Sequence, residues 1–511
     1  QKQCKQGFHF KYFNIYLNNM NISKQFLKSL EKNNNNILGF KNRNGIWQHV
    51  NKTDLSYKIN TCMEILKDNN IQKKDRIVYC GDNSIEWVAW NIASYSMGAI
   101  WVPIYNNQSV DYCNYIINDC TPKLFITENK NFDLDINNAP LISNQIPDGN
   151  KLFSIDRNEG LATLIYTSGT TGKPKGVKLS HENILQNISA INERFSDMKN
   201  YKTLNILPWA HIYGLTCELY YNLLNDNLTY ICNNKENFIK DCKSVQPNTI
   251  FLVPKILELI KKKVEFLDKP IIKYLLPMVI QNIFGRELQV IFMGGARLDP
   301  LVKQFYEENN IIICEGYGCS ETGPLISVNH NISPRDINSV GKILNNVDVK
   351  IVNDEIWASG PNIMSGYWMD PLKTGEVLVR DESFKKWYKT GDSGYINDDF
   401  LYYTGRISEN YKLKNGKFVN VGEIEAICKK YIDGNFIIYG ENNEYNSIIS
   451  DKLIDNDTKN KINKLLTKDI QIKNIRYVSS KEMENFLTPK LSIKRNKLIE
   501  FVSSKQELWI K

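Results

Sequence analysis

Short apolar runs, rich in β-branched and aromatic residues, recur along the chain and restrict the folds open to it. The runs are IVYCG (77–81), AIWVPIY (99–105), KLFIT (123–127), LATLIYT (161–167), TIFLVP (249–254), LQVIFMGG (288–295) and NIIICEGYG (310–318). Helix-like patterns such as 181–194 and 255–267 lie between several of them. Uninterrupted apolar strands that alternate with helices are typical of parallel sheets buried on both faces. We therefore predict an α/β fold of several layers.

The length of 511 residues suggests about three or four structural units. The region 340–406 differs from what precedes it, because its strands are shorter and Gly and Asp mark the turns. After Arg406 a stretch rich in Lys and Asn leads into residues with their own β and α signals. We expect a large N-terminal domain of layered α/β subdomains (1–406), with a β subdomain at about 340–406, and a small α+β domain (407–511).

Charge and cysteine usage exclude several classes of protein. The net charge is +8, but the Lys residues are scattered rather than gathered in the basic stripe of a nucleic-acid-binding protein. Eleven cysteines occur without a CxxC pair or a Cys/His cluster, which argues against a disulfide framework or a zinc site. This pattern favours an intracellular, reducing compartment.

The stretch 87–105 carries no charge over about the length of a membrane span. Because Asn91, Gly98 and Pro103 interrupt it, we expect a buried helix that leads into a buried strand. The first residues lack the apolar core of a signal peptide. The chain does not begin with Met, so earlier removal of an upstream segment stays open. We expect a cytoplasmic or peripherally membrane-associated protein, and leave its organelle and oligomeric state open.

The segment after the strand LATLIYT is dense in Gly, Ser and Thr. Glycines let backbone N–H groups line an anion-binding concavity, while hydroxyls and lysines add donors and charge. Lys173 is followed by Pro174, so this is not a Walker A motif, which requires Ser or Thr there. A flexible surface loop could share the composition. Ser180 is a good N-cap for the helix that follows. The predicted phosphate-binding residues are Thr167, Ser168, Gly169, Thr170, Thr171, Gly172, Lys173 and Lys175.

The string YTSGTTGKPKG (166–176) resembles the signature loop of the acyl-adenylate-forming superfamily. That superfamily includes acyl-CoA synthetases, firefly luciferase and peptide-synthetase adenylation domains. Further segments resemble its motifs in the same order, from about residue 45 to the C-terminus. They are LPWAHIYG (207–214), MGGARL (293–298), EGYGCSETGP (315–324), SVGKILNNVDVKI (339–351), EIWASGPNIMSGYW (355–368), YKTGD (388–392), TGRISENYKLKNGKFVNVGEIE (404–425) and LTPKLSIKRNKL (487–498). The resemblance implies a two-step ligase whose small C-terminal domain is mobile.

The resemblance also implies roles in ATP binding. Adenylation joins a carboxylate to the α-phosphate of ATP, so metal and cations must meet charge on the phosphate oxygens. Glu321, together with Thr170, would hold Mg²⁺ through oxygen ligands. Asp392 would accept hydrogen bonds from the ribose hydroxyls, Arg406 would donate to the ribose, and Tyr317 would lie against adenine. The remaining predicted ATP/AMP-binding residues are Gly294, Gly295, Ala296, Glu315, Gly316, Gly318 and Ser320.

Two departures from the family pattern fall near the predicted catalytic lysine and hinge. Lys494 would bridge the attacking carboxylate and the ribose–phosphate oxygens, but Ile493 stands where the family has Gly. Lys490 and Lys497 are alternatives. Ser408 stands at the hinge position, where the family has Asp or Lys, and cannot make the same ion pairs. The residues Lys412 and Gly416 complete the predicted CoA and hinge segment.

The segment LPWAHIYG is most similar to the one beside the acyl pocket of fatty acyl-CoA synthetases. Trp209, His211 and Tyr213 would line that pocket, with His211 gating it or positioning the carboxylate, or simply packing in an aromatic cluster. The four-residue spacing from Lys412 to Gly416 also resembles that of fatty acyl-CoA synthetases and favours a fatty acid substrate. We expect a medium- or long-chain fatty acid–CoA ligase that uses ATP, Mg²⁺ and coenzyme A. Alternatives are a ligase for an aryl, amino or short-chain acid, or a degenerate nucleotide- or acyl-binding homologue.

Overall fold

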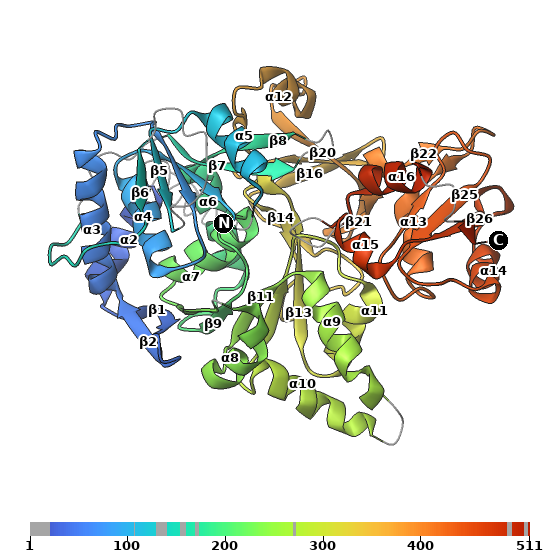
Figure 1. The fold of residues 1–511 in the computed structure, drawn as a ribbon, viewed down its shortest axis with the longest axis horizontal. Helices are drawn as coiled ribbons and strands as arrows, with labels where there is room; N and C mark the ends of the chain where they lie inside the picture. Colours follow the sequence, from blue (N-terminus) through green and yellow to red (C-terminus); the bar gives the residue numbers. More distant parts are fainter. Residues whose placement is uncertain are drawn as a thin grey trace, which may run out of the picture.

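The predicted multi-domain α/β fold is confirmed by a computed structural model of the chain (Figure 1). Two large sheets form the main body, and the strands from β22 (Tyr411–Lys412) onward belong to smaller sheets in a separate lobe on the right of Figure 1, here called the C-terminal lobe. The structure describes residues 21–106, 108–128, 140–153, 160–168, 173–232, 234–268, 272–487, 493–504 and 509–510.

The first sheet has, in the described part of the chain, seven strands in the order β18-β8-β7-β4-β3-β5-β6. Strands β7, β4, β3, β5 and β6 run parallel to one another, whereas β8 pairs antiparallel with both of its neighbours, β7 and β18. Alternate residues of β3 enter two different hydrophobic clusters, which explains why the run 77–81 is apolar throughout. The strands are β3 (Arg76–Cys80), β4 (Ile100–Ile104), β5 (Leu124–Thr127), β6 (Leu141–Ser143), β7 (Leu161–Ser168), β8 (Pro174–Ser180) and β18 (Gly366–Tyr367).

The second sheet follows the order β16-β17-β20-β21-β15-β14-β13-β12-β11-β9-β10-β1-β2 among the described residues, with β19 paired to β20. Along this order, the neighbouring strands between β13 and β1 (β13-β12-β11-β9-β10-β1) pair parallel. The neighbouring strands between β16 and β13 (β16-β17-β20-β21-β15-β14-β13) pair antiparallel. The predicted β region 340–406 therefore continues the large sheet through β14. The strands are β1 (Asn36–Lys41), β2 (Trp47–Asn51), β9 (Lys202–Asn205), β10 (Leu228–Ile231), β11 (Thr249–Leu252), β12 (Val290–Met293), β13 (Ile312–Gly318), β14 (Leu325–Val328), β15 (Lys342–Ile343), β16 (Asp348–Val352), β17 (Glu355–Ser359), β19 (Leu378–Arg380), β20 (Lys386–Asn397) and β21 (Phe400–Arg406).

Helices cover these sheets, and several begin where the sequence predicts. The pattern 181–194 is α6, whose N-cap Ser180 accepts a hydrogen bond from the Asn183 amide. The uncharged stretch 87–105 forms most of α4 and then β4, as predicted. The helices of the main body are α2 (Ile22–Lys32), α3 (Lys52–Asp68), α4 (Ile85–Ser96), α5 (Val110–Cys120), α6 (His181–Arg194), the π-helix η1 (Tyr213–Tyr220), α7 (Tyr221–Leu224), α8 (Phe238–Val245), α9 (Pro254–Val264), α10 (Leu276–Phe284), α11 (Pro300–Glu308) and α12 (Pro371–Val377).

The second half of the predicted phosphate loop is a strand. Pro174 begins β8, which pairs antiparallel with β7 so that Thr167 lies opposite Lys175. The prediction of loop conformation through Gly176 was therefore wrong in its last residues. The Pro does not prevent this pairing, because a strand tolerates Pro at its first residue.

The C-terminal lobe has sheets and hydrophobic clusters of its own, such as the one around Val419, Ile438 and Ile475. Its elements are β22 (Tyr411–Lys412), β23 (Phe418–Val419), α13 (Val421–Cys428), β24 (Phe436–Tyr439), β25 (Asn446–Ser450), α14 (Asn456–Lys464), β26 (Ile472–Tyr477), α15 (Ser480–Glu484), α16 (Arg495–Ser504) and β27 (Trp509–Ile510). A search of the described helices for one long and apolar enough to cross a membrane finds none.

Candidate active site

A buried carboxylate, Asp392, lies where β20 and β21 pair. The Tyr317 hydroxyl at the end of β13 donates to Asp392 Oδ2 at 2.7 Å, and Arg406 Nε lies 2.9 Å from Oδ1. The Arg406 N–H is not aligned with Oδ1, which has no hydrogen bond within the described structure. Burial raises the pKa of Asp392 to about 6, although Arg406 and Tyr317 oppose this shift. A buried carboxylate oxygen whose one neighbouring donor, Arg406, is not aligned with it fits the predicted contact with a ribose hydroxyl.

A second polar cluster surrounds Glu321, which lies in the short 3₁₀ helix Ser320–Thr322. The Tyr367 hydroxyl, from β18, donates to Glu321 Oε1 at 2.9 Å. Lys175 Nζ lies 5.3 Å from the centre of the Tyr367 ring. The pairing of β18 with β8 thus brings the end of the phosphate loop to the predicted metal ligand. No group of three or more His, Cys, Asp or Glu in the described residues could hold a metal, so Glu321 would need phosphate or loop oxygens as co-ligands.

At two positions of the predicted nucleotide-binding set, neighbouring atoms lie so close that they favour glycine. A Cβ at Gly294 would lie 3.0 Å from the Tyr213 ring, and one at Gly318 would lie 1.9 Å from the Pro324 carbonyl oxygen. The neighbouring Gly295 has φ +85°, a conformation that side chains disfavour. The turn 293–296 therefore brings the nucleotide set against Tyr213, which belongs to the predicted acyl segment.

The remaining residues of this set differ in what they offer a nucleotide. The Glu315 side chain points into the core, where it accepts from the Leu298 amide at 3.0 Å and pairs with buried Lys303 at 3.4 Å. Ser320 is buried, while Ala296 is exposed. A Cβ at Gly316 would lie 2.9 Å from Leu325. Glu315 thus serves the packing of α11 with its side chain, and its carbonyl accepts a hydrogen bond from the Asn329 amide at 2.8 Å.

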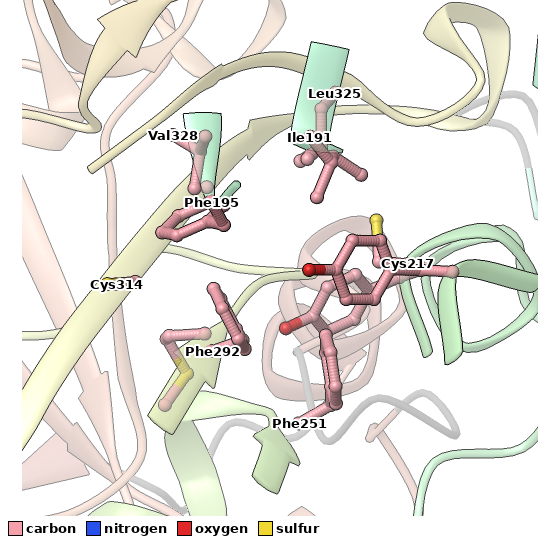
Figure 2. A pocket seen from close by; sticks show the side chains of 12 residues that line it. Ile191, Phe195, Cys217, Phe251, Phe292, Cys314, Leu325 and Val328 are labelled. Carbon is pink, nitrogen blue, oxygen red and sulfur yellow. The ribbon is translucent and has the colours of Figure 1, made fainter. Parts of the chain in front are cut away.

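An apolar cavity lies beside the turn 293–296 (Figure 2). In Figure 2 the labelled side chains surround its centre from several segments of the main body. The free space inside is about 20 Å³, room for about one water molecule. Its lining residues are Ile191, Phe195, Tyr213, Cys217, Tyr221, Phe251, Phe292, Met293, Cys314, Gly316, Leu325 and Val328. The lining carries hydroxyl and thiol groups but no charged side chain among the described residues.

The three residues predicted for the acyl pocket have different positions. Tyr213 lines the cavity, with its ring 6.2 Å from that of Phe251. Trp209 is fully buried against Trp87, at a ring distance of 5.6 Å, and does not line this cavity. His211 Nδ1 accepts a hydrogen bond from the Tyr213 amide at 3.2 Å. His211 therefore orients the turn before η1.

Lys494, Lys412 and Gly416 lie in the C-terminal lobe, and Ser408 lies between β21 and β22. The Lys494 side chain is exposed and makes no hydrogen bond or ion pair within the described structure, so the structure does not join it to Asp392 or Glu321. Its backbone N–H donates to the Phe486 carbonyl at 2.7 Å. Ser408 is exposed, as are Lys412 and Gly416 on the β22–β23 hairpin, where Gly416 has φ +80°.

The predicted phosphate loop and the segment before Lys494 each include residues outside the described part of the chain. Gly169, Thr170, Thr171 and Gly172 lie outside the described residues, as do Lys490 and Ser492. Of Ser168 only the backbone pairing with Pro174 is described. Lys173 is exposed next to this gap. The proposed Thr170–Glu321 metal pair therefore stays a prediction.

Sequence reasoning missed Tyr367 and most of the cavity wall. Tyr367 follows a Gly in a segment quoted for its motif, but nothing in the sequence indicates that its hydroxyl reaches Glu321. Phe195, Phe251 and Phe292 read as ordinary core residues, because they are apolar and lie in or next to regular elements. Only the three-dimensional structure brings their side chains to one cavity.

The fold and the two polar clusters fit the predicted class of adenylate-forming enzymes, and the comparisons with known proteins show the family. The family described as AMP-binding enzyme matches residues 40–368, more than half of the chain. The chain belongs to this family, within the acyl-adenylate-forming superfamily.

Individual matches are distant. A long-chain-fatty-acid–CoA ligase, FadD15 of Mycobacterium bovis, is 23% identical over 75% of this chain and 73% of its own length. Gramicidin S synthase 2 of Aneurinibacillus migulanus is 25% identical over 74% of this chain, which spans 9% of that much longer protein.

Solved structures support the fold. ATP-bound MatB from Rhodopseudomonas palustris has a TM-score of 0.79 at 19% identity, covering 94% of this chain and 99% of that one. The Bacillus subtilis o-succinylbenzoate–CoA synthetase with ATP and magnesium has a TM-score of 0.77 at 19% identity, with the same coverage. The matches support an adenylate-forming CoA ligase, while the acid differs from one match to the next.

Proposed function

We propose that the chain is an ATP-dependent fatty acid–CoA ligase that uses Mg²⁺. The fatty acid and ATP give acyl-AMP and pyrophosphate, and coenzyme A then gives acyl-CoA and AMP. The observation that carries the proposal is the uncharged cavity beside the nucleotide set, because a hydrocarbon chain gains free energy by leaving water for such a wall. The FadD15 match supports the same acid class.

The polar clusters supply the groups for the first step. Asp392 accepts from a ribose hydroxyl through Oδ1, which is paired with Arg406 but makes no hydrogen bond among the described residues, and Tyr317 holds the other oxygen in place. Glu321, oriented by Tyr367, contributes an oxygen ligand for Mg²⁺. A bound Mg²⁺ neutralises charge on the phosphate oxygens. Lys175 and Lys173 add positive charge on the side of the site where the phosphates would bind.

The second step would use a different placement of the C-terminal lobe. We propose a boundary after Arg406, with residues 407–511 turning about Ser408. The lobe's own hydrophobic clusters support this, since it can move without opening the main core. Lys494 would approach the phosphate and carboxylate in one placement, and the β22–β23 hairpin with Lys412 and Gly416 would face coenzyme A in the other.

A second candidate substrate is an aryl or short-chain acid. The cavity is small and three of its walls are Phe rings, with Phe251 and Phe292 stacked at 4.9 Å. A flat or short acid would need less widening of the cavity than a long acyl chain. An amino acid fits poorly, because no described lining residue is a carboxylate that could pair with its ammonium group.

The deciding experiment is ATP–pyrophosphate exchange with a series of saturated fatty acids and a set of aryl acids, followed by acyl-CoA formation with coenzyme A. We expect exchange with fatty acids and formation of the thioester. Exchange with aryl acids alone would replace the fatty acid by an aryl substrate, and no exchange with any acid would indicate a non-catalytic homologue.

A further inference from the structure

The π-helix η1 follows directly on the LPWAHIYG segment, and it buries a carboxyl group that the proposed reaction does not use. All eight residues of η1 are buried, and Glu218 has no exposed surface. π-helical turns are rare and often lie at functional sites. Tyr213 and Cys217, on the same helix, line the apolar cavity, whereas Glu218 does not. One side of η1 therefore forms the cavity wall, and another side carries Glu218.

Two asparagine side chains connect Glu218 to the backbone of LPWAHIYG. Asn205, at the end of β9, donates from Nδ2 to Glu218 Oε2 and also to the Leu207 carbonyl at 2.8 Å. Asn83, in the loop between β3 and α4, donates to Asn205 Oδ1 and to the Leu207 carbonyl, both at 2.7 Å. Asn83 Oδ1 accepts from the Trp209 amide at 2.9 Å. These bonds join the two sheets of the main body at Leu207.

The carboxyl of Glu218 fits this network in its neutral form. Burial raises the pKa of Glu218 well above its ordinary value, while Asn205 and Trp209 act in the opposite direction. Removing a charge from water without a counter-charge is costly, so burial favours the protonated acid. The neutral group still accepts the Asn205 hydrogen bond. An amide of the same shape should therefore replace it.

We propose that Glu218 is a positioning residue: through Asn205 and Asn83 it fixes the Leu207–Trp209 backbone, and thereby His211 and Tyr213, against the acid. The proposal rests on the proposed ligase function. His211 and Tyr213 follow Trp209 within four residues, and Tyr213 connects the network to the cavity wall. Among the described residues Asp392 and Glu321 make no hydrogen bond to the network, so the ATP side should be unaffected.

The test compares four variants in ATP–pyrophosphate exchange with the best acid of the series, and KM is measured separately for acid and ATP. Glu218→Leu removes the acceptor of the Asn205 hydrogen bond, and Glu218→Gln keeps it. Tyr220→Phe is the matched control, because it removes a buried polar group from the same π-helix, where Tyr220 bonds to Asn91 and Tyr95. Asn83→Ala cuts the other end of the network at a partly exposed residue.

We expect Glu218→Leu and Asn83→Ala to raise KM for the acid about tenfold, because each leaves a buried partner unsatisfied. KM for ATP should stay within about twofold. Glu218→Gln should restore KM for the acid to within about threefold of the native protein. Tyr220→Phe should leave both KM values unchanged.

The proposal is overturned if Glu218→Leu raises KM for the acid no more than Tyr220→Phe does, or raises KM for ATP equally. Should Glu218→Leu fail to fold, the same comparison of KM for the acid and KM for ATP is made with Asn83→Ala. Should the native protein activate no acid, the ligase proposal fails separately. The network is then judged by a thermal-unfolding double-mutant cycle of Glu218→Leu and Asn83→Ala, each of which removes a hydrogen bond to Asn205; additive effects overturn it and coupling supports it.

Discussion

The nucleotide side and the acid side of the candidate site are built in opposite ways. On the nucleotide side, a few polar side chains such as Asp392, Tyr317 and Glu321 make directed bonds at 2.7–2.9 Å. On the acid side, apolar residues from many elements share one cavity without a charged group in the described lining. Polar bonds require particular residue types at particular places, whereas an apolar wall requires a total volume and shape. Substitutions on the nucleotide side should therefore lower activity steeply, whereas substitutions on the acid side should mainly change which acid is preferred.

The largest effect should come from Lys494, whose side chain makes no hydrogen bond or ion pair among the described residues. Lys494→Ala should lower the rate of adenylation by ~10²–10³, as expected for removal of a transition-state charge partner. Thioester formation from supplied acyl-AMP should be spared. Lys497→Ala, three residues away and also exposed, is the control and should have little effect. Equal damage to both half-reactions would contradict the assignment.

Asp392→Asn should lower kcat/KM for ATP by ~10²-fold, because the amide is a weaker acceptor than a carboxylate for the ribose hydroxyls. The pKa of Asp392 is raised to about 6, so the native carboxylate gains a proton as pH falls through about 6. KM for ATP should rise below that pH in the native protein and not in the variant. The control Asp399→Asn changes an exposed Asp in the β20–β21 turn. The same pH dependence in both proteins would assign the titration to another group.

Tyr367→Phe should raise the Mg²⁺ concentration needed for half-maximal activity about tenfold, because Glu321 loses the hydroxyl that orients it. Activity is titrated with Mg²⁺ at saturating ATP. Tyr402→Phe removes another tyrosine–carboxylate bond, to Asp336, and should not change the titration. If Tyr367→Phe needed the same Mg²⁺ concentration for half-maximal activity as the native protein, the proposal that Glu321 binds the metal would be contradicted.

The smallest effect should follow Phe292→Leu on the acid side. The smaller side chain widens the cavity by about one methylene group, worth about 0.8 kcal/mol, so the preferred acid should lengthen with a roughly fourfold change in relative kcat/KM. Phe284→Leu, at a buried Phe outside the cavity, is the control for stability. A change in KM for ATP instead of chain length would show that the two sides are not separable.

Much of the fold could be predicted from the sequence, because local signals and tertiary packing agree. The apolar strands and the helix 181–194 appear where their patterns place them, and Ser180 caps that helix. The segment from Pro174 shows where sequence-based prediction of strands fails. Its Gly- and Pro-rich composition is typical of a turn, yet it forms β8, because β7 lies alongside and supplies the pairing partner.

The candidate site could be predicted on its polar side only. Asp392, Arg406 and Tyr317 come together as their motifs imply, although the sequence does not show that one oxygen of Asp392 makes no hydrogen bond among the described residues. Phe251 and Phe292 could not be selected, because a residue in a cavity wall and a residue in a solid core have the same pattern. Glu218 looks like a surface residue by type, and only its complete burial indicates otherwise.

Strand β13 bonds to parallel β12 on one edge and to antiparallel β14 on the other. A protease cut or a gene truncation near residue 340 would therefore not release a self-contained piece. Truncation there would remove β15 and leave β14, the neighbour of β13, with an unpaired edge that could pair with other chains. The main body should consequently melt in one transition, and expression of shorter fragments should stop after Arg406 rather than before the antiparallel strands.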